Sequence, residues 1–323
     1  MKKTARLAIL CLAVLSFAGH AHNVTIPKDI KDMSLKKVTD NVYVVHGIHA
    51  MPDKDNKGFI SNSGIVVSDQ GVVIIDTGGS FQIGEMLLNK ITEVTDKPVI
   101  AVFNTHLHGD HWMGNAAIRK AYPEARIYAH ERAIERLQNG EAEQWLDIFM
   151  QATDGAIEGT QIVLPDTALK GGESIEAAGN TFRIHHTGKA HTDNDIMIEY
   201  PERKTLFAGD IVIYGSTVSG ARPQDFSATG QISAVEYALE LPVDIYVPGH
   251  GPTGGREIPE ATKRFLEILY QSVQRHYDEG LADFEMRDQV ADELSEFSDW
   301  SGFDQIGRLI SYVYQQVEAA EFE

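Results

Sequence analysis

Thr105-His106-Leu107-His108-Gly109-Asp110-His111 follows the apolar run Val99–Phe103 and carries four potential metal ligands within six residues. The apolar run predicts a β-strand, which places the polar stretch on the loop where the strand ends. Alternate residues of a loop can turn toward one point, so the first two histidines can share one ion. The aspartate and the third histidine can face a second ion beside it. Imidazole and carboxylate without thiolate favour zinc, with iron or manganese as alternatives.

Three further residues of ligand type follow other predicted strands. His191 follows the strand that ends at His186, Asp210 follows the run 204–207, and His250 follows the run 245–247. Asp210 and His250 each lie beside a glycine, and His191 lies three residues after Gly188. Glycine permits a sharp turn at these places. Each residue alone is a weak signal, but together with the first cluster they complete the ligand set of a two-metal centre.

The pattern along the chain predicts a layered α/β protein. Short β-branched runs bounded by Gly, Asn and Asp predict strands, and apolar spacing of three to four residues predicts helices. We expect strands at 42–47, 63–68, 71–76, 98–104, 126–130, 181–186, 195–200, 204–211 and 244–247. We expect helices at 80–95, 115–121, 131–139, 141–152 and 233–241, and again from 258 to the end with a break near 298–302. Strands with interspersed helices in two halves indicate one compact α/β domain, with a helical extension at its C-terminus.

The N-terminus has the pattern of a secretory signal peptide. Three basic residues among the first six precede the apolar run Leu7–Phe17, and Gly19 and Ala21 supply small residues before a cleavage site. The apolar run is too short to span a bilayer comfortably. Cleavage would remove Cys11, the only cysteine, so the exported chain would need no disulfide. We therefore expect a signal peptide at 1–21, a main domain at 22–256, a helical extension at 257–323 and a periplasmic location.

Composition and charge narrow the classes of partner. Of 323 residues, 43% are hydrophobic and 23% charged, which is ordinary for a globular protein. Lys and Arg number 28 and Asp and Glu 47, for a net charge of −19, or −22 once three basic residues leave with the signal peptide. Such a protein repels phosphate backbones, so we expect no nucleic-acid partner. No later stretch approaches 18 uninterrupted apolar residues, so we expect no membrane span after cleavage. The default expectation is a monomer acting on a small molecule.

With these motifs, the sequence resembles the metallo-β-lactamase-fold hydrolase superfamily over about residues 40–255. The motifs that carry the resemblance are Asp76-Thr77-Gly78, the cluster at 105–111, His191-Thr192, Gly209-Asp210 and Gly249-His250. The resemblance implies a four-layer αββα sandwich with metals at one edge of its two sheets. It implies one metal on His106, His108 and His191, a second on Asp110, His111 and His250, and Asp210 as the bridge between them.

Such a ligand set fits hydrolysis. Two divalent ions about 3.5–4 Å apart can hold a bridging water and lower its pKa from about 15.7 to about 7. The resulting hydroxide attacks a carbonyl, and Asp110 can orient it and receive its proton. Asp76 is a candidate for holding a histidine in the right tautomer, with a simple turn cap as the alternative. Tyr214, four residues after Asp210, is a candidate for reaching a substrate carbonyl or carboxylate.

The substrate class is less clear than the metal set. Zinc β-lactamases of broad activity commonly have Cys at the bridging position and Lys three residues later, where this chain has Asp210 and Ile213. That departure leaves a β-lactam carboxylate without its usual cation, and Tyr214, Arg222 and Lys189 are the nearby candidates to replace it. Export nevertheless fits β-lactam ring opening, which we take as the leading substrate. Hydrolysis of an ester, thioester or lactone is the alternative, with the segments 47–62 and 212–228 as the expected walls of the pocket.

Two other classes remain open. Persulfide dioxygenases of the same fold use one iron, held by residues equivalent to His106, His191 and Asp210, and this chain retains all three. The intact second set, Asp110, His111 and His250, favours two metals instead. A periplasmic protein that binds a ligand without catalysis is the third class, and an intact catalytic set argues against it.

Overall fold

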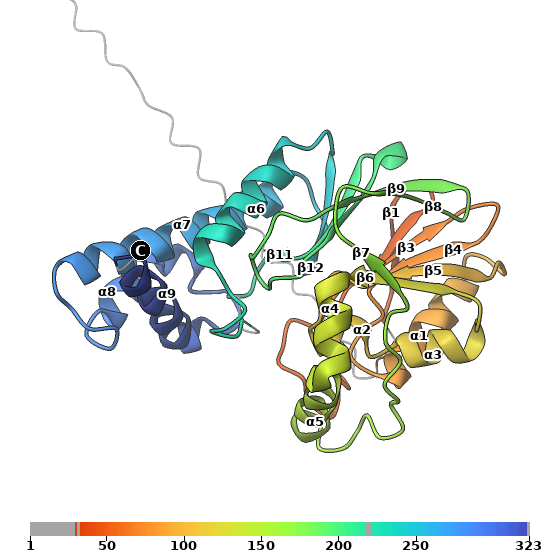
Figure 1. The fold of residues 1–323 in the computed structure, drawn as a ribbon, viewed down its shortest axis with the longest axis horizontal. Helices are drawn as coiled ribbons and strands as arrows, with labels where there is room; N and C mark the ends of the chain where they lie inside the picture. Colours follow the sequence, from red (N-terminus) through yellow and green to blue (C-terminus); the bar gives the residue numbers. More distant parts are fainter. Residues whose placement is uncertain (1–29, 31–32, 218–220, 322–323) are drawn as a thin grey trace, which may run out of the picture.

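The computed structural model describes residue 30 and residues 33–217 and 221–321. Two mixed β-sheets stack face to face, and helices cover their outer faces (Figure 1). The predicted α/β sandwich of the metallo-β-lactamase type is thereby confirmed. The predicted signal peptide at 1–21 lies outside the described residues.

The first sheet has seven strands in sequential order. Its first four strands pair antiparallel, and the pairs from the fourth strand to the seventh are parallel. Helix α1 (Phe81–Thr92) leads into the parallel part, and α3 (Asn115–Ala121) leads from the fifth strand to the sixth. The strands are β1 (Leu35–Thr39), β2 (Val42–Val45), β3 (Ser63–Val67), β4 (Val72–Ile75), β5 (Val99–Phe103), β6 (Arg126–His130) and β7 (Thr167–Leu169).

The second sheet has five strands in the order β12-β11-β10-β9-β8. Only β11 and β12 run parallel, and α6 (Ala228–Glu240) lies between them in sequence. The bounds are β8 (Ser174–Ala177), β9 (Asn180–His185), β10 (Met197–Tyr200), β11 (Thr205–Ile213) and β12 (Ile245–His250). A short 3-10 helix, η3 (Pro201–Arg203), turns the chain from β10 into β11.

Strand alternation sorts the side chains into layers. In β4, Val73 and Ile75 join the core between the two sheets, whereas Val72 and Ile74 join the core under the helices. Phe207 of β11 reaches the central core from the other sheet. This period of two buries both faces of the strand, as expected for a sheet covered on both sides.

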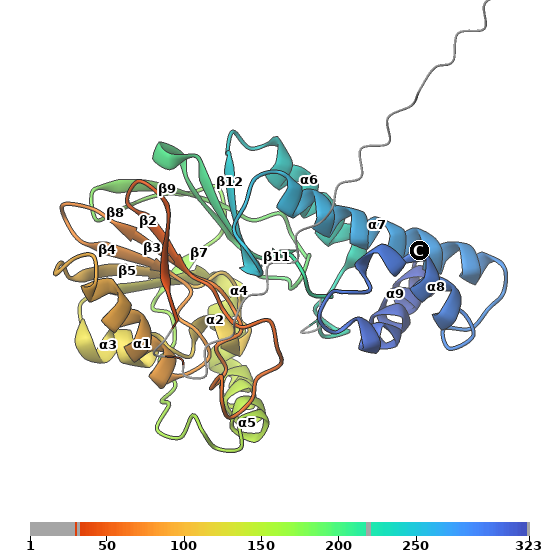
Figure 2. The ribbon, with the colours of Figure 1, turned by 180° about the vertical axis from the view of Figure 1, so that it is seen from behind.

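The other helices frame the two ends of the sandwich (Figures 1 and 2). The short helix α2 (Gly109–Trp112) begins just after β5. Helices α4 (Glu131–Arg136) and α5 (Ala142–Ala152) are joined through η2 (Leu137–Glu141), where Gly140 takes a positive φ of 104°. The C-terminal helices α7, α8 and α9 share a separate apolar core that includes Phe265, Leu269 and Ile310. They and their short connections are α7 (Glu257–Asp278), α8 (Arg287–Glu293), η4 (Ser295–Phe297), η5 (Phe303–Gln305) and α9 (Ile306–Ala320).

Within the described part of the chain, no helix is both long enough and apolar enough to cross a membrane.

Candidate metal centre

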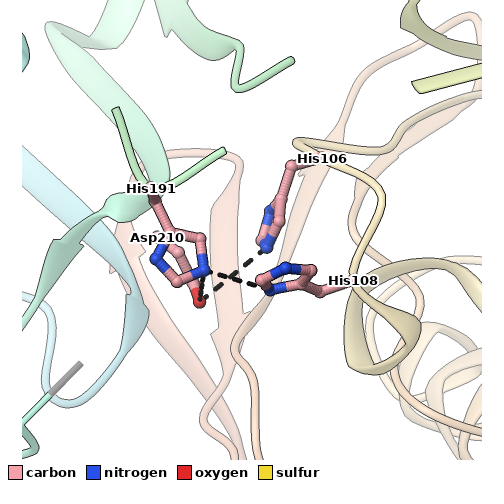
Figure 3. A group of neighbouring side chains, drawn as sticks. All are labelled: His106, His108, His191 and Asp210. Carbon is pink, nitrogen blue, oxygen red and sulfur yellow. Dashed lines mark hydrogen bonds and ion pairs between the residues drawn. The ribbon is translucent and has the colours of Figure 1, made fainter. Parts of the chain in front are cut away.

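Seven side chains from five segments converge where the two sheets meet at one edge. The loop after β5 provides His106 and His108, and the helix α2 provides Asp110 and His111. The loop between β9 and β10 provides His191, whereas Asp210 lies within β11 and His250 ends β12. Ligand atoms of one group lie within 4.8 Å of one another, and so do those of the other. The groups are His106, His108, His191 and Asp210 (Figure 3), and Asp110, His111 and His250.

Asp210 faces both groups. One carboxylate oxygen lies 3.3 Å from Nε2 of His191 and 3.3 Å from Nε2 of His250. The other oxygen lies 3.3 Å from Nε2 of His111. Gly249 makes this position available, because a Cβ there would lie 1.9 Å from Oδ1 of Asp210. Asp210 thus lies between the two groups, the position that the resemblance implies for a bridging residue.

Several ligand atoms are buried and have no hydrogen-bond partner. They include Nε2 of His106, Nε2 of His111 and Oδ1 of Asp210. Burying a polar atom without a partner costs about 1–3 kcal/mol, so three that converge call for a ligand that satisfies them together. Imidazole nitrogens and carboxylate oxygens are common ligands of divalent cations such as zinc, so the residues present fit the metal pair expected from the sequence.

Asp76 holds the loop and one histidine in place. Its carboxylate accepts hydrogen bonds from N–H and Oγ1 of Thr105, both at 2.8 Å, and from Nδ1 of His111 at 2.8 Å. The Nδ1 contact fixes the tautomer of His111 and leaves Nε2 free to face the centre. Asp76 takes a positive φ of 58°, which is uncommon for a residue other than glycine. These contacts favour the orienting role over a simple turn cap.

His250 is oriented by the main chain. Its Nδ1 donates to the carbonyl of Ile60 at 2.8 Å, which leaves Nε2 directed toward Asp110 and Asp210 at 3.3 Å each. This contact joins the end of β12 to the loop before β3, so the two sheets together set the direction of the ring.

A buried charged cluster that the sequence did not predict lies behind His108. Asp225 is 1% exposed, and its carboxylate lies 2.6 Å from Nε of Arg222, 2.7 Å from Nη2 of Arg136 and 4.0 Å from Nε2 of His108. The ring of Trp145 lies 4.7 Å from the His108 ring, and the Arg222 guanidinium lies 5.1 Å from the Trp145 ring. These contacts place Nε2 of His108 toward the cluster and Nδ1 toward His191.

The electrostatics of the centre favour a cation. Burial holds the pKa of His106 well below its usual range and that of His191 at about 3, so both imidazoles are neutral and able to bind a metal. Burial opposes the charge of His250, but Asp210 and Asp110 outweigh it and raise its pKa to about 10. Without a metal, His250 is therefore protonated between the carboxylates of Asp110 and Asp210, and metal binding must release that proton.

A cavity of about 300 Å³ opens over the centre. His108, Asp110, Asp210 and His250 lie on its floor side, and the remaining lining comes from four segments far apart in the chain. The lining residues are Ile48, His49, Ala50, Met51, Pro52 and Ile60, then Trp145, Ile148 and Phe149, then Ile213, Ser216, Ser301, Gly302, Asp304 and Gln305. Among the described residues that line it, none is lysine or arginine. The volume suits a small organic substrate.

A sequence profile of the metallo-beta-lactamase superfamily matches residues 56–250, which is more than half of the chain and includes all seven side chains of the centre. The chain belongs to the metallo-beta-lactamase superfamily. The resemblance drawn from the motifs is confirmed by this match and by the fold.

Relatives of this superfamily chain have different activities in their names. A type 2 metallo-beta-lactamase from Bacteroides fragilis is 22% identical over 76% of this chain and 89% of the relative. A hydroxyacylglutathione hydrolase from Synechococcus is 29% identical over 41% of this chain and 42% of the relative. The solved structure of a sec-alkylsulfatase from Pseudomonas superposes with a TM-score of 0.68 at 18% identity, covering 88% of this chain and half of that one. The superfamily is thus one of metallohydrolases, and the spread of names does not single out one substrate.

The three residues proposed from sequence to meet a substrate carboxylate lie elsewhere than expected. Tyr214 is not among the residues that line the cavity, because its ring packs against Trp300 at 5.6 Å between centroids. Arg222 is engaged by Asp225 as described, and Nζ of Lys189 donates to the carbonyl of Gln224 at 3.0 Å. The role of Tyr214 at the substrate therefore stays a prediction, and none of these three residues of the metallo-beta-lactamase-superfamily chain is among those that line the cavity.

Trp145 is a lining residue that sequence reasoning did not select, because it lies on a helix whose apolar period alone predicts packing. His49 lies in the segment 47–62 that was expected to form a wall, but it has no metal-ligand spacing and was not selected individually. Trp112, which directly follows the ligand cluster in sequence, is fully buried, and its Nε1 donates to the carbonyl of Leu107 under the loop.

Proposed function

We propose that the mature chain is an exported, metal-dependent hydrolase that acts on uncharged esters, thioesters or lactones. The observation that carries this proposal is the lining of the cavity: apolar, uncharged polar, histidine and acidic side chains surround the centre, and no lysine or arginine is among its described lining residues. Away from the centre itself, an anionic substituent would lose water without gaining a lysine or arginine side chain in return. A neutral acyl group carries no such penalty.

The donor set supports two divalent ions, mainly zinc, as the resident metals. His106, His108 and His191 would hold one, Asp110, His111 and His250 the other, and Asp210 would contact both. When bound, such ions polarise a carbonyl and make water acidic enough to react near neutral pH. Iron or manganese would suit the same nitrogen and oxygen donors.

Asp110 has the position of a general base. Its carboxylate lines the cavity and lies 3.3 Å from Nε2 of both His111 and His250. Burial disfavours its charge, but these two histidines outweigh burial and hold its pKa well below the usual range. The carboxylate is therefore ionised, accepts a proton from the attacking water and can pass it to the leaving group.

β-Lactam ring opening is the second candidate function. Two points favour it: the similarity to the Bacteroides fragilis enzyme, which covers 89% of that protein, and the predicted export of this chain. The missing cationic lining places it after neutral esters.

A paired assay tests the order. Zinc-loaded protein is given a chromogenic cephalosporin and nitrophenyl butyrate, and kcat/KM is measured for each. We expect the neutral ester to be the better substrate. Efficient turnover of the cephalosporin with no ester cleavage would reverse the order. The proposal would be rejected if the protein hydrolysed none of the four substrate types: ester, cephalosporin, lactone and thioester.

Export is tested on the protein itself. The full-length chain is expressed in a Gram-negative host, and the periplasmic fraction is analysed by intact mass. We expect a product that begins after residue 21, because Gly19 and Ala21 are placed for cleavage. A full-length product found in the cytosol would contradict this part of the proposal.

A further inference from the structure

The C-terminal extension supplies a wall of the cavity although it supplies none of the seven side chains of the centre. Ser301, Gly302, Asp304 and Gln305 line the cavity over Asp110, Asp210 and His250. They form a short turn that includes η5 and lies between η4 and α9, about 50 residues beyond the last candidate metal ligand.

This turn is fixed to the segment that directly follows β11, the strand that carries Asp210. The N–H of Ser301 donates to the carbonyl of Gly215 at 2.9 Å, and the N–H of Thr217 donates to the carbonyl of Ser301 at 2.9 Å. Trp300, one residue earlier, packs on Tyr214 at 5.6 Å and on Phe265 at 5.4 Å. Backbone pairing and aromatic packing hold the turn at the cavity.

Asp304 places a carboxylate in this wall. Its side chain is exposed, and no ion pair joins it to a lysine, arginine or histidine among the described residues. The acids at the floor, Asp110 and Asp210, each face histidines instead. An anionic substituent that reaches the outer cavity would therefore meet Asp304 without a cation between them.

Another part of the cavity lining is apolar and exposed. Six large hydrophobic side chains are exposed in the described part of the chain, and two of them, Met51 (55%) and Ile148 (46%), line this cavity. Ile48 and Phe149 extend the same surface inward. Exposed apolar side chains gathered at a pocket mark a surface that a ligand covers.

We infer that this site selects acyl substrates with an uncharged aliphatic chain, which lies on Met51 and Ile148, and that Asp304 is a specificity-determining residue that rejects anionic chains. The inference rests on the proposed ester-type hydrolysis. It assigns the selection to residues that do not belong to the metal centre, so it can fail while the hydrolysis stands.

The charge arm compares matched esters: nitrophenyl valerate and the nitrophenyl hemiester of glutaric acid, which differ chiefly in a terminal carboxylate. In the wild type, kcat/KM should be higher for the valerate. In Asp304→Lys, the ratio between the two should fall about tenfold, because a repulsion becomes an attraction at short range. Asp299→Lys is the matched control, since Asp299 is exposed in the same extension but does not line the cavity, and its ratio should stay as in the wild type.

The chain-length arm compares nitrophenyl butyrate with the hexanoate. Burying one methylene corresponds to about a fourfold gain, so the wild type should prefer the hexanoate several-fold. The double variant Met51→Ser/Ile148→Ser should lose most of that preference. Phe284→Ser, which changes a 64% exposed side chain outside the cavity, should keep it.

The outcomes separate the two proposals. Hydrolysis of all four esters with the same ratios in Asp304→Lys and in the serine variant as in the wild type would overturn the inference and leave the hydrolase intact. If the wild type cleaves no ester, the proposed function fails, and the inference is then decided by calorimetric binding of the corresponding anilides. The dissociation constants should show the same dependence on Asp304 and Met51, and equal constants in wild type and variants would overturn it.

Discussion

Asp110 combines two tasks in one carboxylate. It lies in the second ligand group and also lines the cavity, 3.3 Å from each of two ring nitrogens. An amide of the same shape would keep a weak ligand oxygen but accept no proton. Asp110→Asn should therefore lower kcat by about 10²–10⁴-fold, which is the usual contribution of a general base.

The measurement is steady-state kinetics together with metal content and circular dichroism. Asp96→Asn, an exposed change remote from the cavity lining, serves as the control. Near-normal turnover with both metals retained would remove Asp110 from the mechanism.

Asp76 tests whether orientation of a ligand matters as much as the ligand. Asp76→Ala leaves Nδ1 of His111 and both donors of Thr105 without their buried acceptor. We expect metal affinity of the second group to fall about 10–100-fold, with the first group less affected. Equilibrium zinc titration against a competing chelator measures both affinities. Asp76→Asn, which keeps one acceptor oxygen, should lie between the wild type and the alanine variant, whereas unchanged affinity in both would show that Asp76 is only a turn cap.

Tyr214→Phe distinguishes the sequence-based prediction for this residue from its place in the structure. The ring packs on Trp300 and is absent from the cavity lining, so removing the hydroxyl should leave KM for ester and cephalosporin within about twofold of the wild type. A selective rise in KM for the cephalosporin would support the role proposed from the sequence.

At the level of elements, a histidine links the segments that follow β2 and β12. Nε2 of His46 accepts the N–H of Thr253 at 3.2 Å and lies 3.0 Å from its hydroxyl, so the imidazole is held neutral. Burial, with a smaller contribution from Lys36, lowers the pKa of His46 from 6.5 to about 4.

The pH dependence of stability follows from that shift. Between about pH 6.5 and 4 the unfolded chain binds a proton at His46 that the folded chain does not, so this contribution is complete above pH 6.5 and is lost as the pH falls. In metal-free protein, the difference in unfolding free energy between wild type and His46→Gln should shrink by about 2–3 kcal/mol from pH 7 to pH 4. Urea titrations at several pH values measure it, and parallel profiles for the two proteins would contradict it.

Elements with a clear period were predictable, and short or charged ones were not. The strand β6 and the helix α3 have the bounds expected from sequence, because an apolar alternation and a small-residue run are each bounded by turn residues. The edge strands β1 and β8 were not expected, since Leu35–Thr39 and Ser174–Ala177 are mostly polar and gain strand structure from pairing with a neighbour. Local pattern cannot report such pairing.

The site divides in the same way. Ligand-type residues next to apolar strands can be recognised from sequence, because the ends of strands in one sheet share an edge. Asp210 lies inside β11 rather than after it, but it is still at that edge. The cavity walls were only partly predictable. The segment 47–62 does contribute, but α5 and the turn at 301–305 reach the centre through tertiary packing that no local pattern encodes.

For the whole molecule, the bound metals should contribute to stability as well as to activity. Each site stabilises the fold by about 2.7 kcal/mol when the free metal is at 100 times its dissociation constant. Chelation should therefore lower Tm and abolish hydrolysis, and zinc should restore both. Affinity should decline as the pH drops through the histidine range, because protons compete for the ligands.

Elemental analysis of protein made under metal-replete conditions gives the stoichiometry, and calorimetry gives Tm. Two metals per chain, mainly zinc, are expected. One iron and no zinc would instead favour the dioxygenase alternative, in which His106, His191 and Asp210 would hold a single iron.

The turn at 301–305, which is inferred to help select the substrate, is separate in sequence from the residues that would carry out the reaction. Its residues touch the substrate space yet follow every candidate ligand in sequence, and the helices beside them have a hydrophobic core largely their own. If the turn selects substrates as inferred, substitutions within it should change which esters are accepted while the residues that would hold the metals stay unaltered. Replacing the whole helical extension would have a wider effect, because Thr262 of α7 donates to the carbonyl of Ile213 at the end of the strand that carries Asp210.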